Sequence, residues 1–287
     1  MLIKSPIKWM GSKAKLADEI VKLFPTTFNI YFEPFFGSGA VFFKSRPINS
    51  YCSDLMGEPI AVMNAIKNSP EKMYKKFKEL SDELWERDED FYYKVREFYN
   101  NGKDIMNDAT RAAYFLFLLR AGFNGVIRFN AKKNNSWNVP FGKRGTKTLK
   151  KTKLYNSEFF DEILQHSEFL RSGTKIFKVE SFETAILKAK QNDIIYADPP
   201  YTKTSSKKRY NMSWGIEDDK KLRDTLVSAV SRGANFMLSN IIEYKGETNG
   251  YILDLYNGFK YKFIKHQYII GPKAKTRQQV KEILIYS

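Results

Sequence analysis

The sequence of 287 residues is poor in the side chains that form disulfides and compact metal sites. It contains one cysteine, Cys52, and two histidines, His166 and His266. A single cysteine cannot form an intramolecular disulfide, and three separated Cys and His side chains favour no bound metal. Cys52 lies in an apolar run, so we expect a core thiol rather than a nucleophile. These shortages predict a protein of the reducing cytoplasm.

Long apolar segments are also missing. No run approaches the roughly 18 residues that cross a bilayer, and the N-terminus has no signal-peptide core. We therefore expect no membrane association.

Acidic residues are scarce relative to basic ones. The chain has 32 Asp and Glu against 48 Lys and Arg, for a net charge of +16. Such an excess favours a polyanionic partner, although a merely soluble basic protein is the alternative. Hydrophobic residues make up 43% and aromatic residues 15% of the chain. That content suffices for one large domain or for a core domain with an insertion.

The stretch Asp198-Pro199-Pro200-Tyr201 directly follows an apolar run, 193–197, that is typical of a buried strand in a parallel sheet. The prolines end that strand, at the edge of the sheet where ligands bind in open α/β folds. The Asp198 carboxylate and the Pro199 carbonyl can accept the N–H hydrogens of a nucleobase amine, which frees its lone pair. Tyr201 can stack on the base. A strand-ending turn with a capping Asp is the alternative.

Residues 30–43 predict a strand, a glycine turn and a helix. Gly37 and Gly39 permit close approach of the backbone to a ligand, beside the free N–H groups of a helix N-terminus. Phe42 replaces the third glycine of a dinucleotide fingerprint, which favours a smaller zwitterionic ligand. Asp54 follows the next strand, 48–53, where an acid can bind ribose hydroxyls or cap a helix. S-adenosylmethionine fits this pattern.

Two further segments carry candidate cofactor contacts. The Lys8-Trp9 and Gly11-Ser12-Lys13 cluster can line a pocket for an adenine ring and a carboxylate, although Trp9 can also pack on the helix expected at about 16–24. Phe182, after a strand expected at 175–179, can stack on an adenine or belong to the core.

Residues 58–121 lack clear strands and predict helices at 70–85, 89–99 and 108–120, which indicates a helical insertion. Two β-like runs at 123–130 and 136–141 then flank a turn and predict a hairpin, followed by a basic tail. A hairpin rich in Asn, Arg and aromatic residues suits a DNA groove, because Arg can bind guanine and Lys can bind phosphates. Phe123 or Asn124 can fill the gap left by a flipped base. A solvated basic hairpin is the alternative.

The rest of the chain returns to an α/β pattern. We expect helices at 158–170 and 218–231, a strand at 236–240, and a terminal β pair at 261–270 and 282–286.

Taken together, these segments resemble the Dam-type DNA adenine methyltransferases of bacteria and phages. The matching blocks cover nearly the whole chain, at 8–13, 32–39, Asp54, 123–130, 138–142, 198–201 and 275–284. The resemblance implies an α/β fold: a Rossmann-like mixed seven-stranded methyltransferase sheet with an inserted helical and β-hairpin DNA-recognition domain. Residues 1–56 and 156–287 would form the S-adenosylmethionine-binding catalytic domain, and 57–155 the DNA target-recognition domain.

The residue patterns and the resemblance together assign three groups of site residues. The catalytic group is Asp198, Pro199, Pro200 and Tyr201. The cofactor group is Trp9, Lys13, Phe35, Gly37, Gly39, Asp54, Phe182 and Asp198. The DNA-binding group is Lys8, Phe123, Asn124, Val126, Arg128, Asn130, Asn138, Pro140, Lys143 and Arg144.

The resemblance further implies methyl transfer to adenine in double-stranded GATC sites by base flipping. Arg128 would read the outer guanine, Val126 and Pro140 would contact the thymine methyl, and Lys8 would lie near the other guanine. Position 126 is Val where many family members have Leu. We expect S-adenosylmethionine as cofactor, double-stranded DNA as partner, no metal and a monomer or weak dimer.

Two other functions compete with this interpretation. A non-catalytic regulator that reads GATC would tolerate loss of the 198–201 quartet and of Asp54, yet both are present. A methyltransferase acting on RNA is disfavoured by the groove-reading hairpin, because the deep major groove of A-form RNA is poorly readable. Whether a restriction enzyme accompanies the protein stays open.

Overall fold

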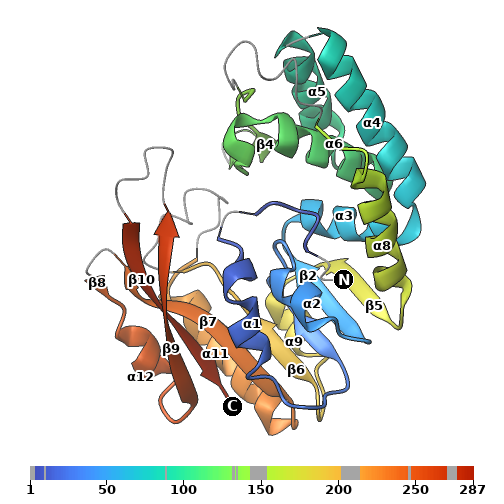
Figure 1. Ribbon diagram of the computed structural model, residues 1–287. Coiled ribbons are helices and arrows are strands. Elements are labelled where there is room, and N and C mark those ends of the chain that lie inside the picture. Colours follow the sequence, from blue (N-terminus) through green and yellow to red (C-terminus); the bar gives the residue numbers. More distant parts are fainter. Residues whose placement is uncertain are drawn as a thin grey trace.

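The computed structural model describes residues 4–9, 11–87, 89–130, 133, 135–142, 154–201, 214–244, 247–269 and 277–287. A mixed sheet with the strand order β5-β2-β1-β6-β7-β10-β9 forms its centre (Figure 1). The first five strands in this order are parallel, and β10 runs antiparallel to both of its neighbours. The predicted seven-stranded mixed sheet is therefore confirmed, and the two-residue strand β8 (Glu247–Thr248) adds a pairing to β7. The seven strands are β1 (Tyr31–Glu33), β2 (Ser50–Asp54), β5 (Lys175–Val179), β6 (Ile194–Ala197), β7 (Asn235–Tyr244), β9 (Lys260–Ile269) and β10 (Arg277–Tyr286).

The central strands are apolar on both faces because helices cover both. Along β6 every residue is buried, and alternate side chains enter two separate cores. Ile194 and Tyr196 pack in the core beneath α1 (Ala17–Val21), α2 (Ala40–Ser45), α3 (Gly57–Asn68) and α8 (Phe159–Arg171). Ile195 and Ala197 pack in the core beneath α9 (Phe182–Ile186), α11 (Ile216–Ser231) and α12 (Tyr251–Leu255). This two-sided burial explains the continuous apolar runs in the sequence.

The predicted helical insertion forms a lobe beside the sheet (Figure 1). It contains α4 (Pro70–Arg87), α5 (Glu89–Gly102) and α6 (Asp108–Ala121), which match the three helices predicted there. The predicted hairpin is present as β3 (Phe129–Asn130) and β4 (Ser136–Trp137), with Phe129 opposite Trp137. Where the first β-like run was expected to start, the chain instead forms the 3₁₀ turn η2 (Phe123–Gly125), with Asn124 in the left-handed region at φ 55°. An Asn-Gly pair favours such a turn over an extended strand.

Helix α3 was not predicted from the sequence. Its buried residues lie on all sides, so it lacks the apolar stripe that marks an amphipathic helix. It is enclosed because it lies between the sheet and the insertion, in contact with α6 and α8. Its buried Glu58 accepts hydrogen bonds from the Tyr99 hydroxyl and the Arg111 guanidinium, both at 2.9 Å. This carboxylate therefore joins the insertion to the helix that leaves the sheet.

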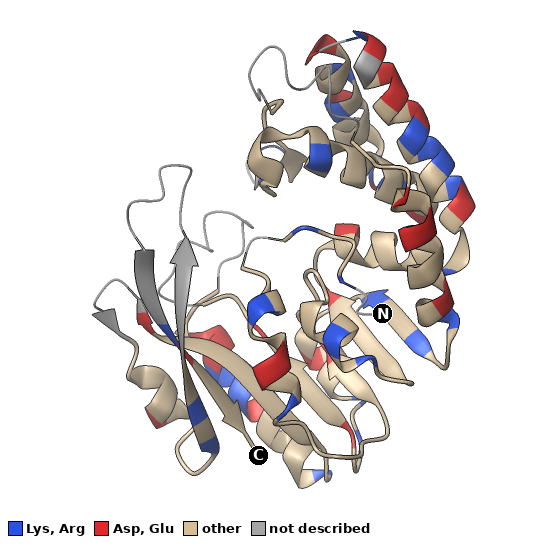
Figure 2. Ribbon diagram, in the orientation of Figure 1, with Lys and Arg blue, Asp and Glu red and all other residues tan. Residues whose placement is uncertain are grey.

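Basic and acidic residues are interspersed along α4 (Figure 2). The strongest concentration of positive charge lies elsewhere in the sequence. Segments 143–153, 202–213 and 270–276, which are outside the described residues, hold twelve Lys and Arg and no Asp or Glu. Among the described helices, none combines the length and apolar character that a membrane crossing requires.

Candidate active site

A pocket lies at the carboxyl ends of β1, β2 and β6, the edge at which the sequence predicted a ligand. Nine of the predicted cofactor and catalytic residues line it: Trp9, Lys13, Phe35, Gly37, Asp54, Asp198, Pro199, Pro200 and Tyr201. Glu33, Met56 and Tyr196 are among its other lining residues. Glu33, Asp54 and Asp198 are thus brought together because parallel strands present their carboxyl ends at one edge.

The glycine loop and Asp54 form one hydrogen-bonded unit. Asp54 accepts the Gly37 N–H on Oδ2 at 2.8 Å and the Met56 N–H on Oδ1 at 2.9 Å. Gly37 has φ +49°, and a Cβ there would lie 3.3 Å from Nε1 of Trp9. Glycine therefore lets the loop and the Trp9 ring approach each other closely. The predicted contact of Asp54 with ribose hydroxyls stays a prediction.

Two residues of the predicted cofactor group do not line the pocket. Gly39 packs closely against the Phe36 ring. Its φ is +66°, and a Cβ there would clash with Cζ of Phe36 at 2.3 Å. Phe182 is buried at the start of α9, where its ring stacks on Phe35 with 5.4 Å between centroids. Phe182 therefore supports the pocket wall through Phe35. Ser181, which precedes it, caps α9 by accepting the Thr184 N–H at 3.3 Å.

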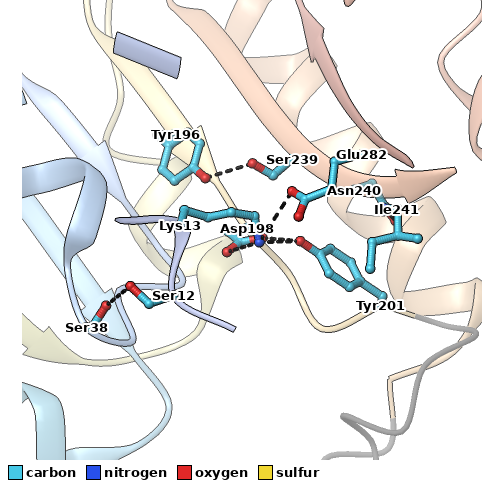
Figure 3. Close-up of polar contacts among 10 residues, drawn as sticks. All are labelled: Ser12, Lys13, Ser38, Tyr196, Asp198, Tyr201, Ser239, Asn240, Ile241 and Glu282. Carbon is cyan, nitrogen blue, oxygen red and sulfur yellow. Dashed lines mark hydrogen bonds and ion pairs between the residues drawn. The ribbon is translucent and has the colours of Figure 1, made fainter. Parts of the chain in front are cut away.

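The Asp198 carboxylate is the centre of a compact polar cluster (Figure 3). The Lys13 ammonium lies 3.0 Å from each of its oxygens. The Tyr201 hydroxyl donates to Oδ1 of Asp198 at 2.7 Å, and Lys13 Nζ donates to that hydroxyl at 2.5 Å. The sequence placed Lys13 in the cofactor group, and the structure places its ammonium on the Asp198 carboxylate. Stacking of Tyr201 on a base stays a prediction.

The pocket is acidic although the protein is strongly basic. Its lining holds the carboxyl groups of Glu33, Asp54 and Asp198 against the single ammonium of Lys13. Burial raises the pKa of Glu33 well above its usual range, opposed by the hydrogen bond that Tyr31 donates at 2.8 Å. Burial also raises the pKa of Asp54 to about 6, opposed by the Gly37 and Met56 N–H groups. A cationic ligand would favour the ionised form of these buried carboxyl groups.

Lys13 remains protonated despite its burial. Desolvation lowers its pKa, but the negative charges of Asp198 and Glu282 outweigh that effect and raise the pKa above its ordinary value. Glu282 lies on β10, and its Oε2 is 3.8 Å from Lys13 Nζ.

Sequence reasoning missed Glu33 and Glu282 as site residues. Glu33 ends the buried strand β1, and an acid at a strand's carboxyl end was a signal that could have identified it. Glu282 carried a weaker signal, a lone acid before the apolar run 283–285. The pairing of β10 with β7, which in turn pairs with β6, brings it within 3.8 Å of the Lys13 ammonium.

The predicted DNA-binding residues gather on the hairpin of the insertion. Phe123, Asn124, Arg128 and Pro140 are exposed, whereas Val126, Asn130 and Asn138 are half-buried. Lys143 and Arg144 lie outside the described residues.

Arg128 and Lys8 are held at defined positions on this surface. Arg128 donates from Nε to the Asn138 side-chain oxygen at 2.7 Å and from a terminal nitrogen to the Asn138 carbonyl at 2.9 Å. Lys8 is exposed and lies beside the η2 turn: a Cβ at Gly125 would lie 3.7 Å from its Nζ. The N-terminal segment that lines the pocket thus also reaches the hairpin.

Helix α5 supports the hairpin through its side chains. Asn100 acts like a strand residue, accepting the Trp137 N–H at 2.6 Å and donating to the Trp137 carbonyl at 3.0 Å. Tyr92 and Arg96 both donate to the Val139 carbonyl, at 2.9 and 3.2 Å. The short strands are therefore positioned by a helix rather than by a long ladder of their own.

In the described part of the chain, no group of three or more His, Cys, Asp and Glu side chains is arranged to hold a metal ion.

Comparison with known proteins finds relatives over nearly the whole length. Residues 9–270 match the family model of the D12 class N6 adenine-specific DNA methyltransferases. The type II methyltransferase M1.LlaDCHI of Lactococcus lactis subsp. cremoris is 31% identical, over 97% of this chain and 93% of that protein. The DNA adenine methylase of Haemophilus influenzae is 28% identical, over 97% and 91%. The type II methyltransferase M.MjaIII of Methanocaldococcus jannaschii is 30% identical, over 99% of each.

Proposed function

Because the chain belongs to the D12 class of N6 adenine-specific DNA methyltransferases, we propose that it methylates the exocyclic amine of adenine in double-stranded GATC sites. The methyl donor is S-adenosylmethionine, and the target base is flipped out of the duplex. One observation carries this proposal. The Asp198 carboxylate, at the carboxyl end of β6, already binds a nitrogen donor, the Lys13 ammonium, at 3.0 Å. An adenine amine needs an acceptor of this kind.

The residues of the pocket fit the proposed cofactor. S-adenosylmethionine carries a sulfonium and an ammonium group, and the pocket offers three carboxyl groups. Trp9, Phe35 and the Gly37 loop would hold the adenosine part, and Asp54 would bind its ribose. When bound, the cofactor supplies a methyl group on a positively charged sulfur, which keeps the electron pair of the broken carbon–sulfur bond.

Asp198 and its neighbours would prepare the substrate amine. Asp198 and the Pro199 carbonyl accept its two N–H hydrogens, which localises the lone pair that forms the new nitrogen–carbon bond. The nitrogen gains positive charge as it takes the methyl group, and the Asp198 carboxylate stabilises that charge until a proton leaves. Tyr201 holds the flipped base by stacking. Positioning supplies most of the acceleration in this scheme.

The hairpin would read the duplex. Arg128 is exposed and held by Asn138, which presents its guanidinium for two hydrogen bonds to guanine. Lys8, beside Gly125, would reach the other outer guanine. Asn124 would help fill the gap after flipping, and Val126 and Pro140 would contact the thymine methyl. We also propose that the enzyme is cytoplasmic and that it is a monomer or weak dimer. Sedimentation analysis would test the oligomeric state.

Transfer of labelled methyl from S-adenosylmethionine to two duplexes tests the reaction and the specificity together. The duplexes are identical except that one contains GATC and the other GTAC. We expect label on the GATC duplex alone. Label on both would retain the enzyme and reject the roles of Val126, Arg128 and Pro140. Binding to GATC without any label would instead support a non-catalytic reader.

A matched variant tests the role of Asp198. Asp198→Ala should abolish methyl transfer while duplex affinity, measured by fluorescence anisotropy, is largely retained. Equal loss of both would contradict a catalytic role.

A further inference from the structure

The position that the proposed function gives to the substrate amine is held by Lys13. Its ammonium contacts both oxygens of Asp198 and the Tyr201 hydroxyl (Figure 3). Oδ1 of Asp198 also accepts the Tyr201 hydroxyl. A carboxylate oxygen has about two lone-pair sites, so Lys13 and the Tyr201 hydroxyl fill those of Oδ1, and Lys13 takes one of the two on Oδ2. The substrate amine therefore gains full access to Asp198 only when the Lys13 ammonium moves.

Lys13 cannot simply withdraw into water. Its residue is only 5% exposed, and a buried ammonium without an anion is strongly unfavourable. When the amine takes Asp198, the ammonium needs a second anion within reach. Glu282 is 0% exposed, and its Oε2 lies 3.8 Å from Lys13 Nζ. A shift of about 1 Å would turn this ion pair into a direct charge-assisted hydrogen bond.

A bulge in the neighbouring strand β7 lies directly beside Glu282. Between Lys281 and Glu282 the pairing of β10 with β7 changes register, because Ile242 is an extra residue in β7. Asn240 stabilises this bulge by accepting the Ile241 N–H at 2.7 Å on its side-chain oxygen. A bulge redirects side chains and is frequent next to active sites.

We propose that Glu282 is a positioning residue that receives the Lys13 ammonium when the substrate amine replaces it on Asp198. The inference depends on the proposed function, in which Asp198 accepts that amine. Lys13 then has two positions, one on Asp198 in the absence of substrate and one on Glu282 during catalysis. Glu282 acts through Lys13 and does not itself contact the base.

Glu282→Gln tests this role because it removes the charge and keeps the shape. We expect the single-turnover rate of methyl transfer, at saturating duplex and cofactor, to fall by about 10- to 100-fold, with little change in KM for DNA. Glu243→Gln, which removes an exposed acid from the neighbouring strand β7, is the matched control and should keep the wild-type rate.

A binding measurement separates this role from a purely structural one. Two duplexes are compared, one with adenine at the target position and one with purine, which lacks the amine. Their ratio of dissociation constants reports the contact between the amine and Asp198. Relative to the wild type, Glu282→Gln should lose preference for the adenine duplex, because Lys13 stays on Asp198. An unchanged ratio together with an unchanged rate would overturn the inference.

The double variant Lys13→Met/Glu282→Gln keeps the test decisive if Glu282→Gln does not fold, because it removes both charges together. If Glu282 acts through Lys13, the double variant is no slower than Lys13→Met alone. A further loss of rate would mean that Glu282 acts independently and would refute the two-position lysine. Failure of the wild type to methylate any adenine duplex would instead refute the proposed function.

Discussion

Cofactor affinity should depend on pH through Asp54. Both oxygens of this carboxylate accept backbone N–H groups, from Gly37 and Met56, so protonation would weaken the hydrogen bonds that hold the glycine loop. Protonation would also remove a negative charge that faces a cationic cofactor. We therefore expect the ionised form of Asp54 to bind S-adenosylmethionine.

The pKa of Asp54 sets the size of the effect. Burial raises it to about 6. A group with this pKa is about nine-tenths protonated at pH 5, so affinity there should be about tenfold weaker than at pH 8. Folding stability should change with pH in the opposite direction to cofactor affinity. The pKa of Asp54 in the folded state lies above its value in the unfolded chain, so ionised Asp54 destabilises the free protein above pH 6. That cost, at most roughly 3 kcal/mol, is relieved as the pH falls from 6 to 4.

Calorimetric titration with S-adenosylmethionine in the absence of DNA measures this effect. The Asp54→Asn variant should bind the cofactor about 2 to 3 kcal/mol more weakly at pH 8. The NH₂ group of the asparagine would face one of the two backbone N–H groups, and two donors cannot form a hydrogen bond with each other. The variant should also lack the tenfold weakening between pH 8 and pH 5. Glu33→Gln is the control, because Glu33 is the other pocket carboxyl whose pKa is raised. If Asp54→Asn kept the pH dependence of the wild type, Asp54 would not be the titrating group.

Three further outcomes follow from the described contacts. Asn100→Ala should cost about 2 kcal/mol in urea denaturation, because it leaves the Trp137 N–H and carbonyl without partners, whereas Asn101→Ala, an exposed neighbour, should change little. Arg128→Ala should lose about 1 to 3 kcal/mol of discrimination at one guanine, measured in a competition assay with single-base variants of GATC. Equal weakening of binding to all variants would indicate a phosphate contact instead. Cys52 should react with a thiol reagent only after denaturation, because it is fully buried and burial raises its pKa; rapid reaction of the native protein would contradict that burial.

The sequence predicted the part of the site that lies at strand ends. Asp54 and Asp198 each follow an apolar strand, and the parallel sheet brings such positions to one edge. The family resemblance is confirmed, as are the sheet and the three helices of the insertion. These features depend on local patterns, which a sequence displays directly.

Features that depend on long-range packing were not predictable in the same way. Helix α3 is enclosed on all sides and shows no stripe. Lys13 was expected to face the cofactor, and nothing near it in the sequence points to Asp198 or Glu282. Phe182 was a candidate for stacking or for the core, and its position behind Phe35 follows from how α9 packs on the sheet.

The insertion leaves and rejoins the sheet at neighbouring strands. The chain passes from β2 into α3, and it returns through α8 into β5, which pairs directly with β2. Arg171 at the end of α8 donates to the Lys67 carbonyl at 2.7 Å, and the Lys67 ammonium donates to the Lys175 carbonyl at 2.6 Å. The carboxyl ends of α3 and α8 are thus joined to each other and to β5. If the hairpin reads the duplex as proposed, an exchange of residues 69–158 between relatives should transfer the part of the target preference that the insertion carries and leave behind the part assigned to Lys8. Under that proposal, new specificities arise by recombination of the insertion while the residues of the pocket stay unchanged.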